Sequence, residues 1–352
     1  MKVRNFYGKG DLRLEEKPVP KAGPGQLVVK IKYCGICGTD LEFYRTGALP
    51  PFVQLPMILG HENIGVVTEV GEGVADFKVG DMLLCGPPSR CEQLCPSCRK
   101  DMTNICINGF PNTAGIGGPD GGYAEYMLVR DAAHTMLIKT PENVDPKDAV
   151  LFDVICVSLH GIRRSNFKFG DNVVVSGTGP IGLSAIQFLK AGGANKIIVL
   201  GTSDEKEPIV MQYGADYYFN SKKCADIGGE IKKILGSPVG ADVVFECAGK
   251  MASLSNCIYQ CVKPGGQVLV IGTIQEPMNI VPSTFSILEP DINFSFVYTE
   301  EDVNIYLEML AAGKISFPNM VTDIVSLDDC MEKFFDKPDR TGMLKVLIDP
   351  SL

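Results

Sequence analysis

The most constraining feature of this sequence is the segment Val173–Gly201. It begins with an apolar, β-branched run, Val173–Ser176, which indicates a buried strand, and a turn of the form G-x-G-x-x-G follows at once. Helical spacing then continues to Lys190, and Lys196–Leu200 forms a second apolar run. Strand, glycine turn, helix and strand in this order form the context that a dinucleotide-binding turn requires. The sequence therefore predicts a parallel α/β sheet of the Rossmann type.

The glycine turn has a mechanical role in holding a pyrophosphate. Glycines allow a tight turn, close approach of the backbone to phosphate, and close packing of helix on strand. Backbone N–H groups at the helix start then face the phosphate charge. The residues that we expect to bind the cofactor here are Gly177, Thr178, Gly179, Pro180, Ile181 and Gly182. Open α/β sheets bind ligands beyond the carboxyl ends of their strands, which adds Cys247, Ala248, Gly272 and Thr273.

Composition narrows the class of protein further. A chain of 352 residues is long enough for two domains. The net charge of −9 disfavours nucleic acids and anionic membranes as partners. No apolar run approaches the length of a bilayer span, and no apolar stretch follows the basic residues at the N-terminus. With 13 cysteines and no export signal in view, we expect a cytoplasmic protein that uses cysteine for metal binding rather than for disulfides.

The first part of the chain differs from the segment around Val173. Short alternating strands at Gln26–Lys32, Ile64–Glu69 and Asp81–Leu84 are separated by glycine turns, which predicts a β-rich domain. Within it, Cys37 is followed 24 residues later by His61, and a thiolate with an imidazole suits zinc. Cys34 and Cys37 also form a C-x-x-C pair, so a redox pair or a zinc knuckle is an alternative that would leave His61 unused.

The second half alternates strands with helices. Further strands are expected at Val243–Glu246, Gln267–Ile271 and Phe294–Val297, which implies a doubly wound parallel sheet. A helix from Asp302 to Ala312 then leads out of this domain, and Val321–Pro350 returns to the first one.

Taken in order, several motifs resemble the zinc-dependent medium-chain alcohol and polyol dehydrogenases. They are Gly-Ile-Cys37-Gly-Thr39-Asp40, Gly60-His61-Glu62, a four-cysteine lobe and the Rossmann turn. The resemblance covers essentially the whole chain and implies a GroES-like, β-rich catalytic domain (residues 1–154 and 299–352) with a Rossmann domain (residues 155–298). It also implies a homodimer or homotetramer.

The resemblance assigns a catalytic zinc. It makes Cys37 and His61 ligands and places Glu62 beside the metal, where family members sometimes bind it directly. The third ligand normally precedes the Rossmann domain, and Asp153 occupies that position. A helix N-cap is the alternative role for Asp153. Cys156 lies three residues later and is better interpreted as a buried small hydrophobic residue.

The second cysteine group comprises Cys91, Cys95, Cys98 and Cys106. Four thiolates within a short loop can enclose a closed, tetrahedral structural zinc, and disulfides are the alternative in a secreted chain. The first spacing is C-x3-C where the family usually has C-x2-C, and Glu92 stands at the usual place. The sequence thus predicts two zinc ions per chain.

Hydride transfer needs a route for the substrate proton. Zinc lowers the pKa of a bound hydroxyl, and the nicotinamide accepts the hydride. Thr39 occupies the position that the family uses as first relay. Glu42 stands where the family often has a histidine, and it is either a proton acceptor acting through water or an ordinary surface residue.

The end of the second Rossmann strand bears on the choice of cofactor. NAD-specific domains place a carboxylate there, on the ribose 2′-hydroxyl, whereas this chain has Gly201, Thr202 and Ser203. Asp204 and Glu205 follow closely, and Lys206 is the nearest cation in the sequence. We therefore predict NAD(P) use with NADP favoured, although Gly201 could simply permit a tight turn.

The function expected from these features is an NAD(P)-linked dehydrogenase of a secondary alcohol, polyol or sugar-type alcohol. A primary-alcohol or threonine-like amino-alcohol dehydrogenase is the alternative within the family. A zinc-ribbon nucleic-acid binder would leave the Rossmann turn unused. A methyltransferase with a Rossmann domain would leave Cys37 and His61 unexplained.

Overall fold

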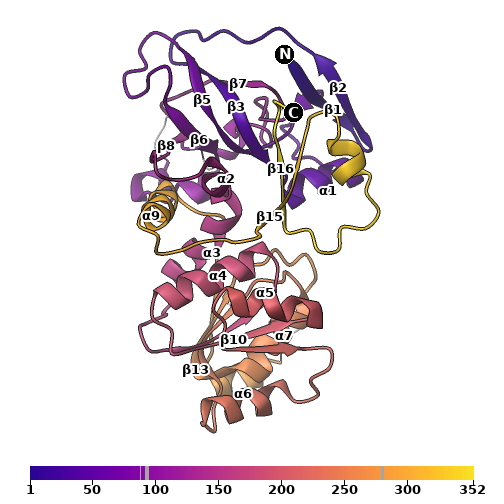
Figure 1. Cartoon of the computed structure of the whole chain (residues 1–352). Coiled ribbons are helices and arrows are strands. Elements are labelled where there is room, and N and C mark those ends of the chain that lie inside the picture. The colour runs from indigo at the N-terminus through magenta and orange to yellow at the C-terminus, as the bar shows by residue number, and fades with distance from the viewer. Residues whose placement is uncertain (88, 92–94, 279–280) are drawn as a thin grey trace. The chain divides into compact units, whose positions relative to one another are not determined.

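The computed structural model describes residues 1–87, 89–91, 95–278 and 281–352. It forms two compact units. The first unit comprises Met1–Asp153, Tyr298–Ala312 and Pro318–Leu352, and the second comprises Val154–Val297 and Gly313–Phe317. Many of their elements are labelled in Figure 1.

The first unit is built mainly from β-strands. Its strands are β1 (Lys2–Gly8), β2 (Asp11–Glu16), β3 (Leu27–Gly35), β4 (Met57–Ile58), β5 (Glu62–Val70), β6 (Met82–Gly86), β7 (Tyr126–Val129), β8 (Met136–Lys139), β15 (Val321–Val325) and β16 (Lys345–Ile348). Its helical segments are α1 (Gly38–Thr46), η1 (Cys98–Lys100), η2 (Thr103–Ile105), η3 (Phe110–Asn112), α2 (Pro146–Ala149), the start of α3 (Phe152–Arg164), α9 (Glu300–Ala311) and η6 (Met331–Phe335). A small sheet has the order β2-β1-β4, and a larger one has the order β15-β16-β3-β5-β6-β8, with β7 also paired to β3.

Strand β3 is central to the larger sheet because it pairs antiparallel with both β5 and β16. At its carboxyl end Gly35 is the register partner of Glu62 on β5 and of Leu347 on β16. Cys37 follows two residues later, so this register brings it next to the His61–Glu62 pair. The C-terminal segment thereby becomes a neighbour of a motif near the N-terminus.

The second unit is a doubly wound parallel sheet, as the sequence predicts. Its strands are β9 (Asn172–Ser176), β10 (Lys196–Gly201), β11 (Tyr217–Asn220), β12 (Ala241–Glu246), β13 (Val262–Val270) and β14 (Asp291–Phe294). Its helical segments are the remainder of α3, α4 (Pro180–Ala191), η4 (Asp204–Lys206), α5 (Glu207–Gln212), α6 (Ile227–Leu235), α7 (Met251–Asn256), η5 (Cys257–Cys261) and α8 (Pro282–Leu288). The order β11-β10-β9-β12-β13-β14 is that of a dinucleotide-binding sheet, with its switch point between β9 and β12.

The core of this unit follows from the strand sequences. Val174, Ile198 and Val244 lie in one register row and are fully buried. They pack in one cluster with Ile231 of α6 and Leu254 of α7. Strands that are buried on both faces need near-continuous apolar runs, which is the pattern that identified β9 and β10 in the sequence.

Two strands differ from the sequence-based expectation. The last strand is Asp291–Phe294 rather than Phe294–Val297, because Val297 has a φ of 44°, in the left-handed region, which no strand continues through. Strand β11 was not predicted, since its four residues are half-buried or exposed and show no apolar alternation.

Candidate functional site

The catalytic-metal candidates converge in the first unit. Cys37 is the residue before α1, His61 and Glu62 stand at the start of β5, and Asp153 is the second residue of α3. One ligand atom from each of the four residues lies within 4.8 Å of those of the others. The structure therefore brings together every residue that the sequence analysis assigned to this metal.

Asp40 organises the Cys37 and His61 side of the group. Its Oδ2 accepts hydrogen bonds from the Cys37 backbone N–H at 3.0 Å and from the Tyr123 hydroxyl at 2.8 Å. Its Oδ1 lies 3.6 Å from His61 Nδ1, which is too long for a hydrogen bond. Burial lowers the pKa of His61, but the charges of Asp40 and Cys37 outweigh burial and hold that pKa well above its usual value. The site is thus strongly negative and attracts a cation.

Two buried carboxylates complete the group, and each has its own partner. The Tyr298 hydroxyl donates a hydrogen bond to Asp153 Oδ1, and the Lys345 ammonium donates to Glu62 Oε1 at 2.5 Å. Burial raises the pKa of Glu62 to about 7, although the Lys345 charge opposes the rise. Because Asp153 lies inside the first turn of α3 and binds Tyr298, its geometry is not that of an N-cap.

The donor set fits zinc. A thiolate, an imidazole and carboxylates are the ligands that zinc takes in open catalytic sites. Among the described residues, His61 Nδ1 and Asp40 Oδ1 face each other at 3.6 Å, both buried and without a hydrogen-bond partner, so Asp40 helps to orient the imidazole that reaches the group. Cys34 is buried in β3 and lies outside the group, so the arrangement is not that of a C-x-x-C knuckle.

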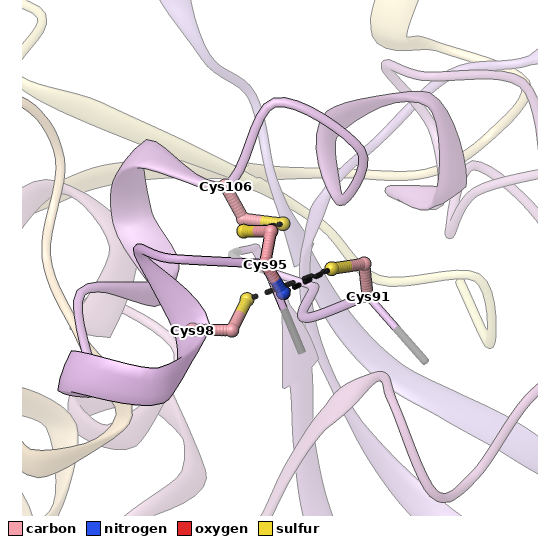
Figure 2. Close-up of side chains that lie close together, drawn as sticks. All are labelled: Cys91, Cys95, Cys98 and Cys106. Atoms are coloured by element: carbon pink, nitrogen blue, oxygen red, sulfur yellow. Dashed lines mark hydrogen bonds between the residues drawn. The ribbon is translucent and has the colours of Figure 1, made fainter. Parts of the chain in front are cut away.

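The four-cysteine lobe forms a second group. Figure 2 shows the side chains of Cys91, Cys95, Cys98 and Cys106 pointing toward a common centre. The Sγ atoms of Cys91 and Cys98 are 3.9 Å apart, and those of Cys95 and Cys106 are 3.8 Å apart. Tetrahedral zinc with bonds of about 2.3 Å to sulfur requires sulfur–sulfur distances of about 3.8 Å. With the C-x3-C spacing, Cys91 Sγ still lies at a distance that such a site requires, while Glu92 lies outside the described residues.

Backbone groups favour thiolates in this lobe. The Cys95 N–H donates to Cys91 Sγ at 3.4 Å and lowers the pKa of Cys91. A backbone hydrogen bond from Cys98 lowers the pKa of Cys95 to about 7. Burial raises the pKa of Cys98 to about 12, which leaves a thiol that only a metal would ionise near neutral pH.

The predicted dinucleotide turn has the required shape in the second unit. Gly177 has a φ of 127°, and a Cβ on Gly182 would lie 2.0 Å from the Gly177 carbonyl oxygen, so neither position admits a side chain. A Cβ on Gly179 would meet nothing within 4 Å, so the backbone there is open to a ligand. The other turn residues, Thr178, Pro180 and Ile181, lead into α4.

Two loops at the strand ends are fixed by one buried carboxylate. Glu246, the last residue of β12, accepts hydrogen bonds from the backbone N–H groups of Ala248 at 2.9 Å and Gly249 at 3.0 Å. Its carbonyl oxygen accepts from Gly272 at 3.0 Å. The segments that contain Cys247, Ala248, Gly272 and Thr273 are therefore held at the carboxyl edge of the sheet. The sequence analysis did not single out Glu246.

A basic residue that is distant in the sequence, Lys223, lies near the end of β10. Ser221, which follows β11, donates from its backbone N–H to the Gly201 carbonyl oxygen at 2.8 Å. Lys223 then forms an ion pair with Asp204. The pairing of β10 with β11 thus brings Lys223 close to the segment Gly201–Ser203, and it was missed because β11 was missed.

The remaining candidates are placed as follows. Thr39 Oγ1 lies 3.7 Å from Cys37 Sγ, and Glu42 is exposed on α1. His134 bonds with Asp131 at 2.7 Å, and Cys156 is buried in α3. In the described part of the chain, no helix is long and apolar enough to span a membrane.

Sequence and structure comparisons place the chain among known dehydrogenases. Residues 23–142 match the alcohol dehydrogenase GroES-like domain, and residues 180–312 match the zinc-binding dehydrogenase domain. Sorbitol dehydrogenase of Rattus norvegicus is 31% identical over 98% of this chain and 95% of its own. The crystal structure of 2R,3R-butanediol dehydrogenase from Bacillus subtilis has a TM-score of 0.88 at 30% identity, with 99% of both chains covered. A Sinorhizobium meliloti 1021 protein named as a zinc-binding dehydrogenase, bound to NADP, has a TM-score of 0.89 at 28% identity and the same coverage.

Metal analysis of the purified protein tests the two sites separately. We expect about two zinc ions per chain, one closed and one open. Cys98→Ser should lower the melting temperature, because a closed structural zinc contributes folding energy. Cys37→Ser should remove one zinc ion and abolish turnover while the melting temperature changes little. Cys224→Ser, at a half-buried cysteine outside both groups, is the control, and full activity in metal-free protein would contradict the assignment.

Proposed function

Because this chain belongs to the zinc-dependent medium-chain alcohol and polyol dehydrogenases, we propose that Cys37, His61 and Asp153 hold its catalytic zinc. The enzyme transfers hydride between a secondary alcohol or polyol and a nicotinamide cofactor. The observation that carries the assignment is the convergence of the ligand atoms of Cys37, His61, Glu62 and Asp153 within 4.8 Å. Cys91, Cys95, Cys98 and Cys106 hold the structural zinc.

The two compact units support a division of the chain into a catalytic domain and a cofactor domain. We propose that residues 1–154 and 299–352 form the catalytic domain and residues 155–298 the cofactor domain. The segment Met1–Asp153 of the first unit carries both groups of metal-ligand candidates, and the second unit carries the glycine turn.

Residues of the chain prepare the substrate site in distinct ways. When bound, zinc supplies a Lewis acid that lowers the pKa of the substrate hydroxyl, and NAD(P) supplies the hydride acceptor. Asp40 fixes the backbone of Cys37 by accepting its N–H. Tyr298 holds the Asp153 carboxylate in one orientation. Thr39, beside Cys37, accepts the substrate proton while its own hydroxyl proton passes through water to Glu42 on the same helix, which releases it to solvent.

The cofactor turn supports a preference for NADP. Gly201 leaves no carboxylate at the end of β10, and a Cβ there would lie 2.3 Å from the Tyr218 hydroxyl. Asp204 is paired with Lys223 and accepts from Asn220 at 2.7 Å, so its negative charge is partly neutralised. Thr202, Ser203 and Lys223 are therefore positioned to meet a 2′-phosphate, a group like that of the NADP bound to the Sinorhizobium meliloti neighbour.

The edge of the parallel sheet supports self-association. Among the described residues β14 pairs only with β13, and it carries the exposed side chain of Phe294 (62%), near Phe296 (57%) and Ile287 (78%). A long exposed apolar edge is a liability unless another strand covers it. We infer a homodimer joined along β14, which is also the building block of a homotetramer. None of the thirteen cysteines, all of them among the described residues, forms a disulfide, which supports the cytoplasmic location that we propose.

Replacement of Asp153 tests the third metal ligand. Asp153→Asn should lower zinc affinity and kcat together by about 10- to 100-fold, because a neutral amide replaces the charged carboxylate ligand while its oxygen can still accept from Tyr298. Nearly normal kinetics and zinc content would assign the ligand role to Glu62 instead. An asparagine still caps a helix, so a merely structural role predicts no change.

Steady-state kinetics with both nicotinamides test the cofactor assignment. We expect a higher kcat/KM with NADP than with NAD. Lys223→Glu should reduce kcat/KM for NADP by about tenfold or more, since a hydrogen bond to a charged group contributes about 1.5 kcal/mol. Lys263→Glu is the control, because Lys263 pairs with Asp242 elsewhere in the second unit. A clear preference for NAD in the unmodified enzyme would contradict this assignment and would show that Asp204 and Glu205 repel the 2′-phosphate.

Sedimentation analysis tests the proposed dimer. Phe294→Asp should shift the protein toward monomer at micromolar concentration, because an added charge at the strand edge opposes pairing. Phe169→Asp, at another exposed aromatic position of the same unit, should leave the assembly unchanged. An oligomer that is insensitive to Phe294→Asp would place the interface elsewhere.

A further inference from the structure

Glu62 is held by a cation from the far end of the chain. Lys345, the first residue of β16, is buried, and its Nζ contacts both oxygens of the Glu62 carboxylate. The backbone N–H of Lys345 donates to the Met320 carbonyl oxygen at 3.0 Å, which fixes the start of the strand. Burying an ammonium group costs several kcal/mol unless it is well paired, so its position opposite Glu62 is strongly determined.

Gly35 provides the space for this ion pair. A Cβ on Gly35 would lie 1.9 Å from Glu62 Oε2 and 3.0 Å from Lys345 Cε. Gly35 is also the register partner of Glu62 on β5 and of Leu347 on β16. The missing side chain therefore creates a space in the sheet that the carboxylate and the ammonium fill together, two residues before Cys37.

Charge counting shows what the ammonium contributes. Cys37, Glu62 and Asp153 supply three negative charges when ionised, and all three lie in the same metal group. A divalent zinc ion and the Lys345 ammonium together offset these three charges, and the buried Asp40 carboxylate beside Cys37 adds a fourth, so loss of Lys345 would leave the site more negative still. Without Lys345, Glu62 would carry an unpaired negative charge within reach of the metal. An unpaired carboxylate in that position would bind the metal through one of its oxygens.

We propose that Lys345 is a positioning residue that keeps Glu62 engaged in an ion pair and out of the coordination position that the substrate needs. This inference rests on the proposed zinc site. Gly35 is a second positioning residue, because it makes room for the ion pair. Glu62 is thereby held as a reserve ligand, beside the metal but bound to the ammonium.

Cadmium NMR of the full-length protein tests the proposal independently of turnover. We expect cadmium to replace zinc at both proposed sites, and because its chemical shift depends on its ligands the four-thiolate site serves as an internal reference. In Lys345→Met the cadmium resonance of the site formed by Cys37, His61 and Asp153, the mixed site, should move because Glu62 becomes a ligand. The resonance of the four-thiolate site should stay in place. Zinc loss to a chelator from that site should slow, and kcat/KM should fall by about 10- to 100-fold.

Three further variants separate this role from simple stabilisation. Lys345→Arg keeps the charge and should restore the resonance. Lys345→Met combined with Glu62→Gln removes both charges together, and because no carboxylate is left to bind the metal the resonance should return to its place in the unmodified protein, even if Lys345→Met proves too unstable to study. Lys333→Met, which removes an exposed ammonium paired with Asp329, should change nothing.

Failure of the Lys345 positioning role and failure of the proposed zinc site would give different results. A Lys345→Met protein that folds, with the mixed-site resonance and chelator release of the unmodified protein, would overturn the positioning role. A mixed-site resonance in the double variant displaced as in Lys345→Met would overturn it as well, because no carboxylate remains there to bind the metal. If Cys37→Ser leaves the mixed-site resonance unchanged, the zinc site itself is wrongly assigned.

Discussion

The pairing of β3 with both β5 and β16 is the constraint on which the metal site of the first unit depends. It places Gly35 at the end of β3, Glu62 at the start of β5 and Leu347 of β16 in one row of the sheet, with Lys345 two residues before Leu347. Cys37, His61, Glu62 and Lys345 all follow from that register, although they are separated by up to several hundred residues along the chain. A slip of one residue would turn alternate side chains to the opposite face and separate the ligands.

Buried charge then orders the site within this frame. Each anionic side chain around the metal group has its own donors: Asp40 accepts from the Cys37 backbone and Tyr123, Asp153 from Tyr298, and Glu62 from Lys345. Such an arrangement would be costly without a cation at its centre, because the fixed negative charges lie close together and away from water. The hydrogen-bond donors hold the ligand side chains in place, and a bound metal ion offsets the repulsion between their negative charges. Stability and chemistry therefore depend on the same contacts.

In the second unit the main constraint is the glycine turn between β9 and α4, which must let the backbone approach a phosphate. The contact between Gly182 and the Gly177 carbonyl keeps α4 close to β9, and Gly179 leaves the turn open. Local sequence is sufficient here because the strand, the turn and the helix are contiguous. That is why the Rossmann architecture was predicted correctly, whereas β11 and the true limits of β14 were not: both strands lie at the sheet edge and lack an apolar pattern.

Sequence alone determined the features that depend on residue type and local spacing. These include the two fold classes, the glycine turn, the four-cysteine lobe, and the grouping of Cys37, His61 and Asp153 through resemblance to a family. Only the tertiary structure decided which partners these residues have. Lys345, Tyr298 and Glu246 show no recognisable motif, and Lys223 became relevant only through a strand pair. The physical reason is that ion pairs and hydrogen bonds between distant segments are set by strand register, which no local pattern in the chain records.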